Sequence, residues 1–73
     1  MRHKMKSEVI KDPSVMGGAP VIRGTRVPAH FIAWLVHRGV AEVEILDDYP
    51  SLTREDIRVA VEYASRHPED GED

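Results

Sequence analysis

The segment from Met16 to Pro28, Met-Gly-Gly-Ala-Pro-Val-Ile-Arg-Gly-Thr-Arg-Val-Pro, places the strongest constraint on how this chain can fold. Its three glycines and two prolines force particular backbone angles. A flexible linker would not place branched apolar residues between them. We predict a tight hairpin in which residues 19–22 return as a strand against Val9 and Ile10, with Asp12-Pro13-Ser14 as turn residues. The exit of this hairpin leads into a helix.

The size of the chain limits what it can do alone. Its 73 residues correspond to one domain, and a core of this size supplies about 3–5 kcal/mol of net stability. There is no cysteine to form a disulfide, so a partner or a second copy is the expected supplement. The longest apolar run, Phe31 to Val36, is far shorter than the ~20 residues of a membrane span. With no signal-peptide pattern at the start, we expect a soluble cytoplasmic protein.

Charge is distributed unevenly along the chain. Residues 1–30 hold six basic and two acidic side chains, a net charge of +4, whereas residues 31–73 hold four basic and eleven acidic ones, a net charge of −7. Such asymmetry is typical of a protein with two different partners. A solubilising surface with a basic N-terminus would give the same numbers.

Three helical patterns follow the hairpin segment. The first begins at Pro28 and stops at Gly39, the second covers residues 41–48, and the third has Thr53 as its N-cap and stops near Arg66. We therefore predict a mainly α fold with a hairpin and three helices over residues 9–66, a flexible basic segment 1–8 and an acidic disordered tail 67–73. The side chains expected on the buried faces are Phe31, Ile32, Leu35 and Val36, then Val43, Ile45, Leu46 and Tyr49, and finally Ile57, Ala60, Val61 and Ala64.

The second and third helices have the proportions of a helix-turn-helix, in which the second helix of the motif enters the major groove of DNA. Thr53, Arg54 and Arg58 would then lie nearest the bases. The structural alternative is a plain three-helix core in which Arg58 pairs with Glu62 and Glu55 is exposed.

The sequence Arg23-Gly-Thr-Arg26 is a second candidate for contact with phosphate, because arginine can bind phosphate through two parallel hydrogen bonds. The alternative is structural. Asp47 and Asp48 lie at the end of the second helix, where the helix dipole disfavours them, and a nearby arginine would offset that cost.

No constellation for catalysis or metal binding stands out. His30 and His37 are two helical turns apart, with Trp34 between them, which is too far for one shared ion. We therefore expect no metal, no cofactor and no enzymatic activity. Trp34 is expected to be largely buried, against the hairpin or a second chain.

Residues Ile10–Pro28, Gly39, Ile45–Ile57 and Ala60–Ala64 closely resemble the bacterial family known as domain of unknown function 433. The family is more often Ser, Thr or Asp where this chain has Ala41. The resemblance implies a homeodomain-like helix-turn-helix bundle. It also implies an antitoxin that neutralises a PIN-like ribonuclease toxin and binds operator DNA as a homodimer. The alternative is a protein-interaction module of the same fold without DNA binding.

The antitoxin hypothesis assigns a surface to each partner. We expect the toxin to contact Glu42, Glu44, Asp47 and Asp48, and secondarily the tail 69–73, because a ribonuclease needs a basic channel. We expect operator DNA to contact Thr53, Arg54, Arg58, Arg23 and Arg26. The hairpin is expected to join two copies, since an isolated two-stranded hairpin is only marginally stable.

Overall fold

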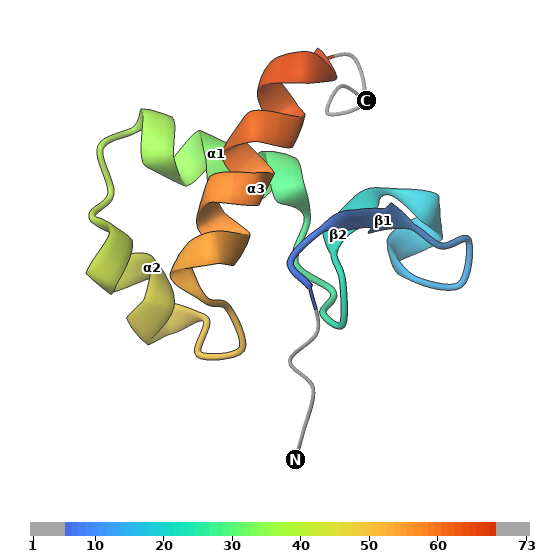
Figure 1. Cartoon of the computed structure of the whole chain (residues 1–73), viewed down its shortest axis with the longest axis horizontal. Coiled ribbons are helices and arrows are strands. Elements are labelled where there is room, and N and C mark those ends of the chain that lie inside the picture. The colour runs from blue at the N-terminus through green and yellow to red at the C-terminus, as the bar shows by residue number, and fades with distance from the viewer. Residues whose placement is uncertain (1–5, 69–73) are drawn as a thin grey trace.

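The structure is a computed structural model that describes residues 6–68, and it is mainly helical, as predicted (Figure 1). A two-stranded hairpin precedes three helices. The elements are β1 (Val9–Lys11), a single 3-10 turn η1 (Met16–Gly18), β2 (Pro20–Ile22), α1 (Ala29–His37), α2 (Glu42–Asp48) and α3 (Arg54–Arg66). Most of the predicted flexible ends, 1–8 and 67–73, lie outside the described residues.

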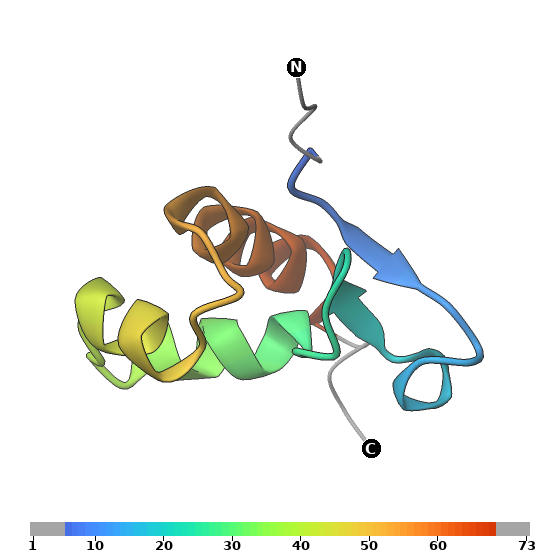
Figure 2. The same cartoon turned by 90° about the horizontal axis from the view of Figure 1, so that it is seen from below.

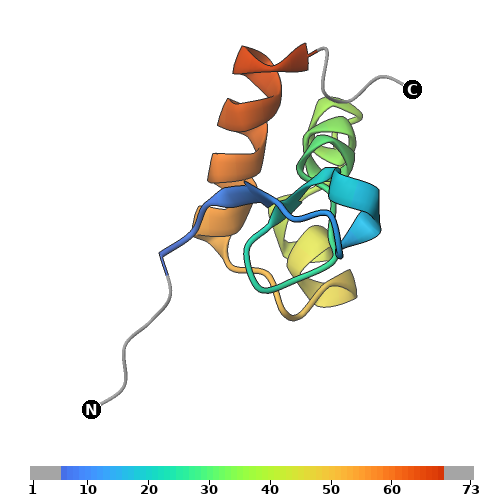
Figure 3. The same cartoon turned by 90° about the vertical axis from the view of Figure 1, so that its right-hand side faces the viewer.

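The helices form a small group with the hairpin at one end. Figures 1 and 2 both place α2 at the opposite end from the hairpin, with α1 and α3 between them. Viewed from the hairpin side, α1 and α3 stand next to each other behind the strands (Figure 3). The contact between α1 and α3 is the most extensive between any two described elements.

The hairpin has the predicted pairing. β1 and β2 are antiparallel, with Val9 opposite Ile22 and Ile10 opposite Val21. At the turn, the Ser14 backbone N–H and hydroxyl both donate to Asp12 Oδ1, at 2.9 and 2.8 Å. These two hydrogen bonds favour the ionised carboxylate and lower the pKa of Asp12 below its usual value of 3.8.

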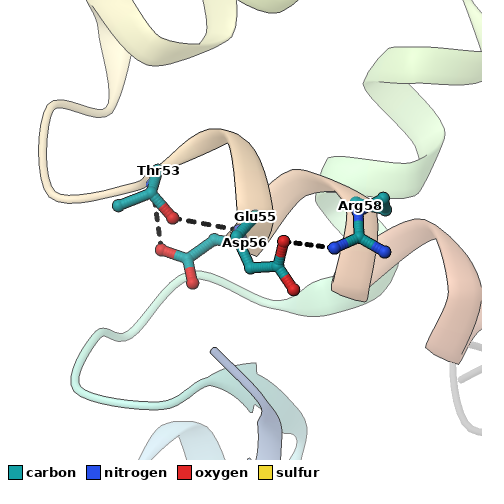
Figure 4. A network of polar contacts seen from close by, with 4 residues as sticks. All are labelled: Thr53, Glu55, Asp56 and Arg58. Atoms are coloured by element: carbon teal, nitrogen blue, oxygen red, sulfur yellow. Dashed lines mark hydrogen bonds and ion pairs between the residues drawn. The ribbon is translucent and has the colours of Figure 1, made fainter. Parts of the chain in front are cut away.

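Each helix boundary has a local cause. The chain leaves α1 through Gly39, whose φ of +86° is easily adopted by glycine, and the Gly39 and Val40 N–H groups donate to the carbonyls of Val36 and Leu35. α2 begins after Ala41 without a side-chain cap. α3 begins with a capping box of Thr53 and Asp56 (Figure 4), so the predicted N-cap Thr53 is confirmed.

The core joins β2 to all three helices. Its buried members are Ile22, Ala29, Ile32, Ile45, Leu52, Ile57 and Ala60. Val21 and Ile22 are 0% and 1% exposed, so the short second strand is as deeply buried as the centre of any helix. The hairpin is therefore part of the core.

Three apolar residues do not have the predicted burial. Trp34 is 53% exposed, Val43 is 64% exposed and Val36 is 36% exposed. Trp34 and Val43 each lie two residues from a fully buried isoleucine, Ile32 and Ile45, which places them about 200° away around the helix. Val36 lies in the last turn of α1. The prediction that Trp34 is largely buried is wrong for the single chain, and its burial against a second chain stays a prediction.

Candidate nucleic-acid and partner interfaces

The start of α3 presents the predicted DNA-contacting residues to solvent. Thr53 is the N-cap, and the side chains of Arg54 and Arg58 are 75% and 69% exposed. The preceding turn is closed by the Leu52 N–H, which donates to the Tyr49 carbonyl at 2.9 Å. α2, this turn and α3 therefore follow one another in the order that the sequence predicts.

The Arg23-Gly-Thr-Arg26 turn is held by Thr25. The Thr25 hydroxyl and backbone N–H both donate to the Ile22 carbonyl, and the Val27 N–H donates to Thr25 Oγ1 at 3.0 Å. The chain then returns along β2, with a bridge from Val21 to Pro28, before it enters α1. Arg23 and Arg26 consequently project from the outside of a well-defined turn.

A polar groove separates this turn from the start of α3. It is lined by Lys6, Ser7, Arg23, Gly24 and Thr25 on the hairpin side and by Ser51, Thr53, Arg54, Glu55 and Asp56 on the other. The structure thus brings together three of the predicted DNA-contacting residues, Arg23, Thr53 and Arg54. Arg58 and Arg26 lie outside the groove. Lys6 and Ser51 also line the groove, and Ser51 is missed by sequence reasoning because no sequence spacing links it to the turn.

Most of these arginines have carboxylate partners. Arg54 Nε lies 3.4 Å from Glu42 Oε1, Arg23 pairs with Glu8, and Arg58 pairs with Glu55. Arg26 has no ion pair among residues 6–68. These pairs are exposed, so each contributes between about 0 and 1 kcal/mol to stability. Because Glu55 and Asp56 also line the groove, carboxylates in and beside it offset the charges of Lys6, Arg23 and Arg54.

The ion pairs differ from those suggested by the sequence. Glu62 pairs with Arg66 at 3.2 Å, four residues further along the helix, which leaves Arg58 to Glu55. Arg23 reaches across the hairpin to Glu8 instead of offsetting Asp47 or Asp48. The structural alternatives for Arg58 and Arg23 are therefore wrong in their choice of partner.

α2 carries a group of exposed carboxylates. Glu42, Glu44, Asp47 and Asp48 are all exposed, whereas Ile45 is 1% exposed and anchors the helix to the core. Of the four, Glu42 alone forms an ion pair within residues 6–68. The exposed Val43 lies among them. At 3.6 residues per turn they cover about two thirds of the helix circumference, and we call Glu42, Val43, Glu44, Asp47 and Asp48 together the acidic face.

The outer side of α1 carries an exposed aromatic group. Phe31 stacks on Trp34 at 6.1 Å between ring centroids, and the Arg38 guanidinium lies 4.9 Å from the centre of the Trp34 ring.

His30 Nε2 lies 2.8 Å from the His67 carbonyl oxygen. Among residues 6–68 no group of three or more His, Asp or Glu side chains could hold a metal ion.

These features define a small three-helix domain with an integral hairpin, a polar groove lined by both basic and acidic side chains, and an acidic helix. The chain belongs to the family described as "Protein of unknown function (DUF433)", whose model matches residues 9–64. No described helix is long and apolar enough to cross a membrane.

Two relatives extend the comparison. The chain is 43% identical over 60 residues to "Uncharacterized protein y4eO" of Sinorhizobium fredii, a match that covers 82% of this chain and 27% of that protein. It is also similar to the crystal structure of a DUF433 member protein from Anabaena variabilis, with 37% identity and a TM-score of 0.71. That match covers 84% of this chain and 60% of the other. The chain therefore spans about a quarter and about three fifths of these two relatives.

Proposed function

We propose that this domain is an antitoxin that binds and neutralises a PIN-like ribonuclease through the acidic face of α2. The observation that carries the proposal is the exposure of four carboxylates around Val43 on one seven-residue helix. A basic RNA-binding channel is complementary to such a face, and opposite potentials speed encounter and set the register of the complex.

The position of the carboxylates also favours a binding role. Asp47 and Asp48 occupy the last turn of α2, which contains no basic residue. Negative charge at a helix C-terminus is unfavourable because it lies against the helix dipole. An exposed arrangement that lowers helix stability is more easily explained by a partner than by folding.

The test is co-expression with the product of the neighbouring reading frame, followed by capture of the complex and an assay of ribonuclease inhibition. Asp47→Lys/Asp48→Lys should abolish capture, whereas Glu55→Lys/Glu62→Lys, an equal change of charge on α3, should leave it intact. Deleting residues 68–73 tests the tail, most of which lies outside the described residues. If inhibition survives both the reversal on α2 and this deletion, the electrostatic account is wrong.

Operator DNA is a second candidate ligand, supported by the groove that gathers Lys6, Arg23, Thr53 and Arg54. Arg54→Ala/Arg58→Ala should weaken binding to the upstream region of the gene and flatten its salt dependence by about 0.9 per lost phosphate contact. Arg38→Ala/Arg66→Ala removes the same charge elsewhere and is the control. Absence of binding in the wild type, with or without the toxin, would favour the pure interaction module.

We further propose that the domain acts as a homodimer joined at the hairpin. Within residues 6–68, β1 is paired with a strand on one side only, by β2, and an open strand edge can pair with a strand of a second copy. Light scattering at high micromolar concentration tests this, and a stable monomer would contradict it.

A further inference from the structure

One ion pair connects the two candidate interfaces. Within residues 6–68, the contact between Arg54 Nε and Glu42 Oε1 at 3.4 Å is the only ion pair that joins one helix to another. The pairs Arg58–Glu55 and Arg66–Glu62 lie within α3. Glu42 belongs to the acidic face of α2, and Arg54 lines the polar groove.

We propose that Glu42 masks Arg54 in the free domain, and that a basic protein partner bound to the acidic face takes Glu42 and releases Arg54 for a nucleic-acid phosphate. This inference rests on the proposed function. The two ligands then bind cooperatively, because the partner removes Glu42 from Arg54 and the phosphate removes Arg54 from Glu42. By thermodynamic linkage, the phosphate at Arg54 must raise the affinity of the partner by the same factor.

The weakness of the ion pair makes the exchange feasible. Both side chains are solvent-exposed, 75% for Arg54 and 47% for Glu42, so a lysine or arginine of the partner can replace Arg54 with little loss. The same weakness limits the coupling to at most about fivefold, the upper end of the range for exposed ion pairs.

The effect is specific to Arg54. Arg23, the other arginine of the groove, is paired with Glu8, which precedes β1 and is remote in sequence from α2. A partner that takes Glu42 therefore removes the acceptor of Arg54 and not that of Arg23.

Glu42→Gln imitates the partner-bound state without requiring the partner. The probe is a fluorescent duplex of about 20 base pairs from upstream of the gene, titrated at about 50 mM salt. We expect Glu42→Gln to bind about two- to fivefold more tightly than the wild type. Glu44→Gln removes an equal charge from the same helix and has no ion pair within residues 6–68, so it measures the general effect of lost negative charge.

A double-mutant cycle with Arg54→Ala assigns the gain to the pair. In the Arg54→Ala background, Glu42→Gln should give no more gain than Glu44→Gln. The inference is overturned if Glu42→Gln binds no more tightly than Glu44→Gln, if the gain persists without Arg54, or if Glu42→Gln fails to bind the duplex. Failure of partner capture alone would overturn the proposed function and leave the masking of Arg54 by Glu42 standing.

Discussion

Thr53 and Asp56 cap α3 reciprocally: the Asp56 backbone N–H donates to Thr53 Oγ1 at 3.1 Å, and the Thr53 backbone N–H donates to Asp56 Oδ2 at 2.9 Å (Figure 4). Aspartate is one methylene shorter than the glutamate usual at this position, yet both hydrogen bonds form. Asp56 is 8% exposed, so its carboxylate is at once buried and satisfied. The start of α3, which carries the candidate DNA contacts, is therefore fixed before any ligand binds.

Replacing Thr53 by Ala should destabilise the domain by about 1 kcal/mol, because the Asp56 N–H loses its acceptor. For a domain of this size, the melting temperature should fall by about 4–8 °C. Thr53→Ser keeps the hydroxyl and should stay close to the wild type. Equal melting temperatures for Thr53→Ala and Thr53→Ser would show that the cap contributes nothing.

Adding a cap to α2 should have the opposite effect. Ala41 has the extended backbone of an N-cap, with φ −66° and ψ 146°, but no oxygen to accept a hydrogen bond. Ala41→Thr should stabilise the domain by about 0.5–1 kcal/mol. Ala41→Val has the same shape without the oxygen and isolates the cap. Urea denaturation midpoints compare the two, and a Val variant as stable as the Thr variant would refute the effect.

Trp34 should contribute less to stability than its size suggests. With 53% of the residue exposed, Trp34→Ala should cost clearly less than Ile32→Ala, for which about 2–5 kcal/mol is expected at a fully buried site. In dilute solution its fluorescence should be red-shifted and readily quenched by acrylamide. Protection at high concentration would indicate that a second copy covers Trp34.

Acidification should weaken the hairpin through Asp12. Its pKa is lowered in the fold by the two hydrogen bonds from Ser14, so the stabilisation is present above the unfolded pKa and is lost as the pH falls through the folded value. The window therefore lies at and below about pH 4. Asp12→Asn keeps an acceptor oxygen but cannot titrate. As the pH falls through this window, the stability of Asp12→Asn relative to the wild type should therefore rise. A constant difference would exclude Asp12 as the cause.

The sequence predicts the features that depend on neighbouring residues. Gly39 ends α1, Thr53 begins α3, and Val9 and Ile10 pair with the strand ending at Ile22, because each depends on local backbone chemistry. The exposure of Trp34 and Val43 within the chain is not predictable from periodicity, because α1 and α2 are only about two turns long. Over so few residues, packing against other elements decides which side faces the core.

Ion-pair partners were the least predictable feature of the candidate interfaces. Arg54 finds Glu42 on another helix and Arg23 finds Glu8 on the other arm of the hairpin, and neither spacing is a helical or strand repeat. The positions of these arginines could be predicted, but the extent to which carboxylates neutralise them could not. That neutralisation determines how much positive charge the candidate nucleic-acid interface can offer to phosphate.

The burial of Val21 and Ile22 determines where this domain can be cut from a longer protein. A chain starting at Pro28 would retain all three helices but would expose the part of the core that β2 now covers. The family match begins at Val9, the first residue of β1, and so includes the strand with which β2 pairs. Transplanting the domain therefore requires a junction before Val9, because helices moved without the hairpin would expose the apolar side chains that β2 covers.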